Sequence, residues 1–205
     1  MKNSVKSAIR ALAAVALMAA VSAPALALEP GQVVDNFRLL DQRGKSHELH
    51  YLSGMRAVVI MVQGNGCPIV RQALPALAEV RARYQSQGVE FLLLNSNLQD
   101  KRELVAREAE EFKIDFPILL DESQLIGEAL GVVRTSEVFV IDPKGWKLAY
   151  RGLMDDRLSY ERQRPAKNHY LTDALDAMLA GKPVTTPHAD GVGCLVNFPE
   201  RERKM

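Results

Sequence analysis

The chain has 205 residues, of which 47% are hydrophobic and 25% are charged. This length suits one substantial domain, and the balance excludes a wholly disordered, collagen-like or coiled-coil protein. With 26 basic and 25 acidic residues the formal charge is +1, so no overall field attracts nucleic acid or an anionic membrane. The 2 cysteines are too few for a disulfide-rich scaffold or a cysteine-rich zinc module, but they suffice for one disulfide or one redox pair.

Residues 1–27 have the pattern of a cleaved signal peptide. Three basic residues precede an apolar run over 11–21, which is too short to cross a bilayer as a helix. The small residues that follow predict cleavage after Ala27 and export to a bacterial periplasm, where a disulfide can persist. An uncleaved membrane anchor is the alternative. No second apolar stretch is long enough to span a membrane, so we expect no membrane contact after cleavage.

The first half of the remaining chain predicts a hairpin followed by a strand–helix–strand unit. Residues 33–52 alternate in polarity around a turn at 41–44, which indicates an N-terminal hairpin. The apolar run over 58–62 predicts a strand buried on both faces. A helix should begin at Pro68 and stop at Gly88, before a parallel strand over 89–94.

The second half continues the alternation of helices and strands. Asp100 and Glu103 resemble a capping box for a helix through Phe112, with Leu104 and Phe112 on its apolar face. Later elements are a strand at 116–120, a short helix capped by Ser123 and ended by Gly131, a hairpin over 138–151, and a helix over 168–181. This order predicts an α/β fold of three layers, α/β/α, around a central mixed sheet, as in thioredoxin-like proteins; element order alone also fits other three-layer folds. We expect one domain over 28–182 and a tail over 183–205.

Cys67 is the strongest candidate for chemistry. It follows the glycine-rich end of the strand over 58–62 and directly precedes Pro68, which opens a helix. Its sulfur should therefore lie near free backbone N–H groups and the positive end of the helix dipole, and both favour the nucleophilic thiolate. The alternative is an inert buried cysteine, which has little need of a Gly-Asn-Gly approach.

Several motifs together resemble the peroxiredoxin-like redoxins, a subgroup of the thioredoxin superfamily related to alkyl hydroperoxide reductase and thiol-specific antioxidant proteins. The motifs are Gly66-Cys67-Pro68-Ile69-Val70, the hairpin from Phe139 to Gly145, Tyr150-Arg151-Gly152 with Asp155-Asp156, the segments 173–177 and 179–183, and Gly193-Cys194. The resemblance covers roughly 30–198. It implies a thioredoxin fold, and a thiol–disulfide or peroxide-reducing, antioxidant activity that needs no cofactor.

The sequence departs from this family's patterns around Cys67. Val70 takes the place of the second cysteine of a C-x-x-C motif, so exchange between those two positions is impossible. Gly64 and Ile60 replace the threonine and proline that precede a peroxide-attacking cysteine. Where thioredoxins place a cis-proline, the chain has Arg134 followed by Thr135. Arg134 either faces Cys67 and lowers its thiol pKa or lies in solvent.

Cys194 lies beyond the last helix, among glycines that allow a close backbone approach. Its partner is either Cys67 or a cysteine of another molecule. A Cys67–Cys194 bridge is either permanent or catalytic. In the catalytic version Cys67 is the nucleophile, Cys194 resolves its oxidised form, and an external thiol reductant or a protein disulfide completes the cycle.

Two other functions remain open from the sequence. Cys67 and Cys194, together with His188, have donor types that suit Cu(I), which would make the protein a copper-binding or assembly factor. A non-catalytic interaction module with a structural disulfide is the third hypothesis. His47 and His50 have the spacing of a metal pair, but on a hairpin they indicate surface residues, so we expect no metal site there.

Overall fold

The computed structural model describes residues 27–160 and 164–199. The predicted signal peptide, apart from Ala27, and the last six residues of the predicted tail lie outside these ranges. Within them, none of the helices combines the length and apolar character needed to span a bilayer.

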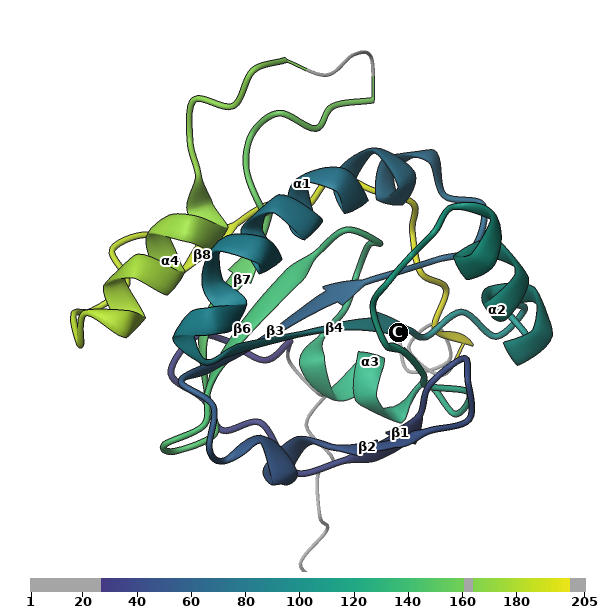
Figure 1. The fold of residues 1–205 in the computed structure, drawn as a ribbon, viewed down its shortest axis with the longest axis horizontal. Coiled ribbons are helices and arrows are strands. Elements are labelled where there is room, and N and C mark those ends of the chain that lie inside the picture. Colours follow the sequence, from purple (N-terminus) through teal and green to yellow (C-terminus); the bar gives the residue numbers. More distant parts are fainter. Residues whose placement is uncertain (1–26, 161–163, 200–205) are drawn as a thin grey trace, which may run out of the picture.

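A six-stranded mixed sheet forms the centre of the fold (Figure 1). Its strand order is β5-β4-β3-β6-β7-β8, with β3 parallel to β4 and antiparallel to β6. The strands are β3 (Ala57–Val62), β4 (Val89–Asn95), β5 (Ile118–Leu120), β6 (Val138–Asp142), β7 (Lys147–Gly152) and β8 (His188–Ala189). A separate antiparallel hairpin pairs β1 (Arg38–Leu40) with β2 (Ser46–Glu48), as predicted.

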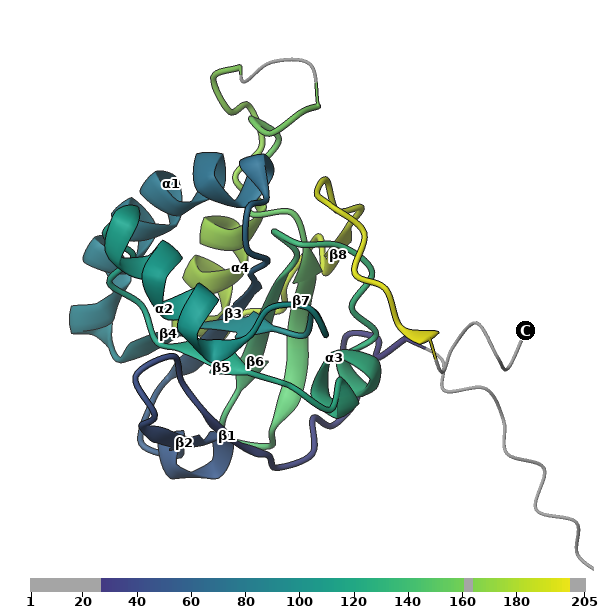
Figure 2. The same cartoon turned by 90° about the vertical axis from the view of Figure 1, so that its right-hand side faces the viewer.

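Helices cover both faces of the sheet (Figure 2). The helices are α1 (Pro68–Tyr84), α2 (Arg102–Glu111), α3 (Leu125–Leu130) and α4 (Tyr170–Leu179), with short 3-10 turns at Leu49–Leu52 and Gln85–Gln87. Along β3, Val59 and Met61 pack with α1, α2 and α4, whereas Val58 and Ile60 pack with α3 and the hairpin. This alternation follows from the two-residue period of a strand, and it confirms the predicted three-layer α/β/α arrangement.

The strand–helix–strand unit that positions Cys67 agrees with its prediction. All six side chains of β3 are buried, and α1 begins at Pro68. Gly88 ends the helical segment with a φ of +85°, a conformation that favours glycine. Strand β4 then returns parallel to β3, so the β3–α1 junction lies at the carboxyl edge of the sheet.

The predicted starts of the two middle helices were wrong. Helix α2 begins at Arg102 without a side-chain cap, because Asp100 instead accepts hydrogen bonds from the N–H of Asn65, in the loop before Cys67, and from the side-chain amide of Asn95 at the end of β4. Helix α3 begins after Gln124 rather than being capped by Ser123, and Asp121 accepts the N–H of Gly127. Leu104 and Phe112, expected on the buried face of α2, are instead 45% and 39% exposed.

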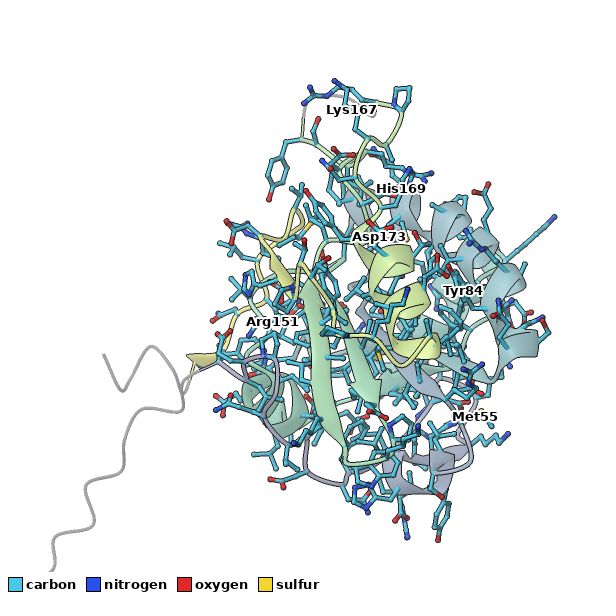
Figure 3. The ribbon with its side chains drawn as sticks, turned by 90° about the vertical axis from the view of Figure 1, so that its left-hand side faces the viewer. Met55, Tyr84, Arg151, Lys167, His169 and Asp173 are labelled. Carbon is cyan, nitrogen blue, oxygen red and sulfur yellow. The ribbon has the colours of Figure 1, made fainter. Side chains whose placement is uncertain are left out.

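The chain after α4 returns along the sheet, and its short strand β8 was not predicted. His188 and Ala189 pair parallel to the end of β7. At Gly152 an added Cβ would lie 1.9 Å from the Ala189 carbonyl oxygen, so only glycine permits this approach. Arg151 is buried beside this edge (Figure 3) and donates to the carbonyls of Leu28 and Gly131.

Candidate redox site

Cys67 lies at the junction between β3 and α1. It is the residue immediately before the helix, with an extended backbone (φ −73°, ψ 114°), and its N–H donates to the carbonyl of Gly64 at 3.2 Å. Its side chain is 4% exposed and belongs to the core between the sheet and α1. The sequence-predicted neighbours Gly66 and Pro68 flank it directly, and Gly66 has a φ of +72°.

The structure brings Cys194 to Cys67 from 127 residues further along the chain. Their Sγ atoms are 2.6 Å apart, and the Cys194 side chain is exposed. The tail around Cys194 runs antiparallel to residues 133–135, with Arg134 opposite Leu195. The N–H of Thr135 donates to the Cys194 carbonyl at 2.9 Å, and the N–H of Val196 donates to the Val133 carbonyl at 3.0 Å. These backbone hydrogen bonds therefore hold the sulfur of Cys194 next to that of Cys67.

Thr135 contacts both cysteines. Its Oγ1 is 3.1 Å from the Cys67 sulfur and accepts the N–H of Cys194 at 2.9 Å. Because the oxygen already accepts this hydrogen bond, the hydroxyl proton is free to point at the sulfur. Ser136 has a φ of +65° and donates its N–H to the Val62 carbonyl, which fixes the turn that presents Thr135.

The two thiols differ in acidity. Burial of the Cys67 sulfur raises its pKa, but hydrogen bonds from Cys194 and Thr135 outweigh this effect, and its pKa lies below that of an ordinary thiol. Burial and the hydrogen bond with Cys67 raise the pKa of Cys194. Cys67 is therefore the sulfur that holds the negative charge when one proton leaves the pair.

Arg134 contacts the tail. Its guanidinium donates to the Tyr160 hydroxyl at 3.1 Å and to the Gly193 carbonyl at 3.2 Å. Tyr160 in turn accepts the N–H of Gly193 and donates to its carbonyl. At Gly193 an added Cβ would lie 1.9 Å from the Thr135 carbonyl oxygen, so this position needs glycine. Of the two roles considered for Arg134, the structure supports neither: it is bonded to the tail rather than directed at the sulfur or free in solvent.

Two carboxylates that the sequence analysis did not assign to the site hold the loop before Cys67. Asp100 accepts the N–H of Asn65 at 2.9 Å, and Glu108 accepts the N–H of Gly66 at 2.7 Å. Glu108 is 8% exposed and also accepts from the Arg71 side chain at 3.3 Å, one helical turn after Cys67. The sequence around Asp100 predicts a helix cap rather than a contact with this loop, and Glu108 has no sequence signal beyond its place on a helix.

The histidines are not gathered around the cysteines. His47 bonds Asp41 at 2.9 Å, and His50 stacks on Trp146 with ring centroids 4.2 Å apart. His188 lies on β8 and pairs with Asp190 at 3.5 Å. In the described ranges, no three or more His, Cys, Asp or Glu side chains are grouped so that they could hold a metal ion.

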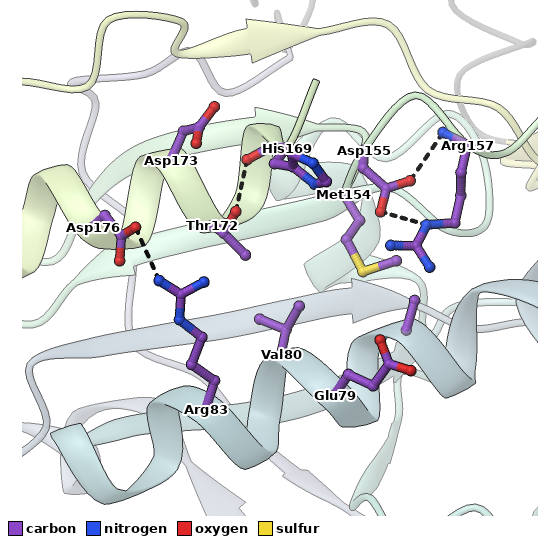
Figure 4. Close-up of a pocket in the computed structure, with 11 residues that line it drawn as sticks. Glu79, Val80, Arg83, Met154, Asp155, Arg157, His169, Thr172, Asp173 and Asp176 are labelled. Carbon is purple, nitrogen blue, oxygen red and sulfur yellow. Dashed lines mark hydrogen bonds and ion pairs between the residues drawn. The ribbon is translucent and has the colours of Figure 1, made fainter. Parts of the chain in front are cut away.

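A separate pocket between α1 and α4 has charged walls (Figure 4). Arg83 pairs there with Asp176 at 3.5 Å, and Arg157 pairs with Asp155 at 2.8 Å. Its described lining residues include neither cysteine, so the hollow is distinct from the sulfur pair.

Comparisons with known proteins agree on the family. The model of the Redoxin family matches residues 29–167. The thiol-disulfide oxidoreductase ResA of Geobacillus thermodenitrificans is 31% identical over 119 residues, which cover 58% of this chain and 67% of that protein. The match therefore spans about two thirds of that relative's own length.

Solved structures of similar proteins support the same fold. An uncharacterized conserved protein from Geobacillus kaustophilus is 29% identical, with a TM-score of 0.75 over 83% of this chain and 93% of that one. A hypothetical protein from Sinorhizobium meliloti is 28% identical, with a TM-score of 0.74 over 83% and 95%. With its thioredoxin-like sheet and a family match over most of its length, the chain belongs to the redoxin family.

Proposed function

We propose that the protein is an exported thiol–disulfide oxidoreductase whose working group is the Cys67–Cys194 pair. The observation that supports this most is the 2.6 Å separation of the two sulfurs, since a bond between them needs almost no backbone movement. The name of the ResA relative, a thiol-disulfide oxidoreductase, is consistent with this chemistry. Export rests on the signal-peptide pattern of residues 1–27, and an N-terminus at Leu28 in the secreted protein would support it.

The reaction moves two electrons between two dithiols. In the reducing direction, the thiols of Cys67 and Cys194 give two electrons and two protons to a partner's disulfide. The partner leaves with two thiols, and Cys67 and Cys194 become joined by one disulfide. An external dithiol reductant reverses this change. The lowered pKa of Cys67 supports the exchange, because the thiolate is both the nucleophile and the better leaving group.

A peroxide is the other oxidant the pair would accept in an antioxidant role. Cys67 thiolate would displace an alkoxide or hydroxide from the peroxide and become a sulfenic acid. Cys194 would then form the disulfide with release of water. The Thr135 hydroxyl lies 3.1 Å from the Cys67 sulfur, whereas position 64 is glycine.

Serine variants of both cysteines test the proposal. We expect Cys67→Ser and Cys194→Ser each to reduce turnover of a protein disulfide, in the presence of a dithiol reductant, to the uncatalysed rate. Thr185→Ser, on an exposed part of the tail, is the control and should keep full activity. Activity in both cysteine variants equal to that of the wild type would refute the proposal. Turnover of hydrogen peroxide by the same proteins separates the two oxidants.

A further inference from the structure

The two sulfurs of the site differ in their access to solvent. Cys67 is 4% exposed and is packed within the core beneath α1. Cys194 is exposed, and its sulfur is the neighbour of Cys67 at 2.6 Å. A sulfur of another molecule must approach along the axis of the bond that it breaks, so access decides which of the two it meets.

The segment beside Cys67 is fixed at several points. Backbone hydrogen bonds join the tail to Thr135 and Val133. Arg134 and Tyr160 bond Gly193. Beyond Cys194, Val196 and Phe198 are buried on the face of the sheet that packs with α3 and the hairpin. Moving the tail away from Cys67 would break several of these contacts, whereas Cys194 is exposed with the tail in place.

We infer that outside thiols and disulfides react at Cys194, and that Cys67 completes the exchange from inside the fold. This inference rests on the proposed function and assigns a separate step to each sulfur. It places the contact with other molecules on the tail instead of on the residue at the start of α1.

The steps balance for reduction of the protein by a dithiol. A thiolate of the reductant attacks Sγ of Cys194, the Cys67–Cys194 bond breaks, and Cys67 leaves with the electron pair as a thiolate. The second thiol of the reductant, once deprotonated, attacks its own bonded sulfur and releases Cys194, which takes up a proton. The reductant departs as a disulfide. In the opposite direction the Cys194 thiolate attacks one sulfur of the outside disulfide, that S–S bond breaks, and the other sulfur leaves as a thiolate. The Cys67 thiolate, 2.6 Å away, then attacks Cys194, and the partner's remaining sulfur leaves as a thiolate.

Geometry and acidity both suit Cys67 as the group that leaves when an outside thiolate attacks Cys194. The Thr135 hydroxyl lies 3.1 Å from Cys67, where it can stabilise the departing thiolate. The depressed pKa of Cys67 makes it the better leaving group of the two. Acidity alone would favour Cys67 as the more reactive thiol toward outside reagents, so the inference makes a prediction opposite to that from acidity.

Limited labelling of the reduced full chain tests the inference. The wild-type protein is treated with one tenth of an equivalent of iodoacetamide at about pH 9, near the pKa of a free thiol, and the label is located by peptide mass spectrometry. We expect at least about ten-fold more label on Cys194 than on Cys67, as access dictates. The excess should disappear in denaturant. A smaller excess in the folded protein, or a preference for Cys67, would overturn the inference.

Single-cysteine variants distinguish a failure of this inference from a failure of the proposed function. Cys194 in Cys67→Ser should react with an aromatic disulfide reagent at least about ten times faster than Cys67 in Cys194→Ser. If oxidation joins no Cys67–Cys194 disulfide, the proposed function fails. If the disulfide forms and cycles but outside reagents prefer Cys67, only the present inference fails.

Discussion

The Thr135 hydroxyl affects both the position of Cys194 and the acidity of Cys67. One oxygen accepts the N–H of Cys194 and faces the sulfur of Cys67, so it connects the position of the tail to the acidity of the buried thiol. A hydrogen bond to a charged acceptor is stronger than one to a neutral acceptor, so this contact favours the thiolate.

Removing this hydroxyl should raise the pKa of Cys67. In a Cys194→Ala background, where one thiol titrates, Thr135→Val should shift the ultraviolet titration of the thiolate to higher pH. Thr135→Ser keeps the hydroxyl and should restore the original curve. Superimposable curves for the valine and serine variants would show that the hydroxyl does not stabilise the thiolate.

Glu137 predicts a dependence of stability on pH. Burial raises the pKa of this carboxyl, against the opposing effects of the Val133 N–H and the charge of Arg151. Because its pKa is higher in the folded than in the unfolded protein, the folded state favours the protonated form. The contribution of Glu137 to stability therefore falls as pH rises from the unfolded pKa through the folded one.

Glu137→Gln should accordingly be more stable than the wild type near pH 7 and equal to it near pH 4, where the wild-type carboxyl is protonated. Urea unfolding at both pH values measures the difference. Glu79→Gln, on the exposed face of α1, is the control. A variant less stable than the wild type near pH 7 would contradict the assigned effect of burial.

Residue-scale predictions from sequence succeed where the signal is local. Pro68 and the glycines before Cys67 are adjacent to it, so the place of Cys67 before a helix could be predicted. The contact of Arg134 with Gly193 could not be predicted from the sequence, because it depends on the path of a segment 59 residues away.

The loop between β3 and α1 is the element that sets the position of Cys67. Asp100 and Glu108 hold two of its consecutive N–H groups, those of Asn65 and Gly66. Glu108 also bonds Arg71, which stacks on Phe112 with its guanidinium carbon 4.0 Å from the ring centroid. Helix α2 and the first turn of α1 are thereby joined around the cysteine.

Glu108→Gln should destabilise the protein by about 1–3 kcal/mol, since the hydrogen bonds of a buried charged acceptor are weakened or lost. Glu110→Gln, exposed on the same helix, should change the free energy of unfolding by less than about 0.5 kcal/mol. Urea unfolding measures both variants. Equal stability for the two would mean that Glu108 does not hold the loop.

Continuous apolar runs and helix stop signals sufficed to predict β3, α1 and β4, because each is determined by its own sequence. The starts of α2 and α3 were predicted wrongly because they are not determined by their own sequence alone. Asp100 and Ser123 have the chemistry of helix caps, but Asp100 bonds a loop 35 residues earlier, and Gln124 precedes α3. A tertiary hydrogen bond such as that of Asp100 leaves no periodic signal in the sequence.

At the scale of the whole molecule, the tail after α4 connects parts of the fold that lie far apart in the sequence. It pairs with β7 through β8, crosses beside Cys67, and buries Val196 and Phe198 against the far face of the sheet. The three-layer arrangement could be predicted from the order of elements. The path of the tail could not, since a two-residue strand and a glycine at position 152 carry little pattern.

Oxidation should stabilise the fold. A Cys67–Cys194 bond closes a loop of 127 residues, which in the chain-entropy model contributes roughly 4–5 kcal/mol. We expect the oxidised protein to unfold at a higher urea concentration than the reduced protein, and Cys194→Ser to be unaffected by oxidant. A reduced protein as stable as the oxidised one would argue against the closed loop.

The reversible bond between Cys67 and Cys194 is tested most directly by mass spectrometry of the wild-type chain through one redox cycle. After mild oxidation, the account predicts a loss of two hydrogens, no alkylation of either cysteine, and a linked pair of peptides containing Cys67 and Cys194. A dithiol reductant should then restore both thiols in the folded protein. Cysteines that both remain alkylatable after oxidation, or a bond that the dithiol opens only in denaturant, would contradict it.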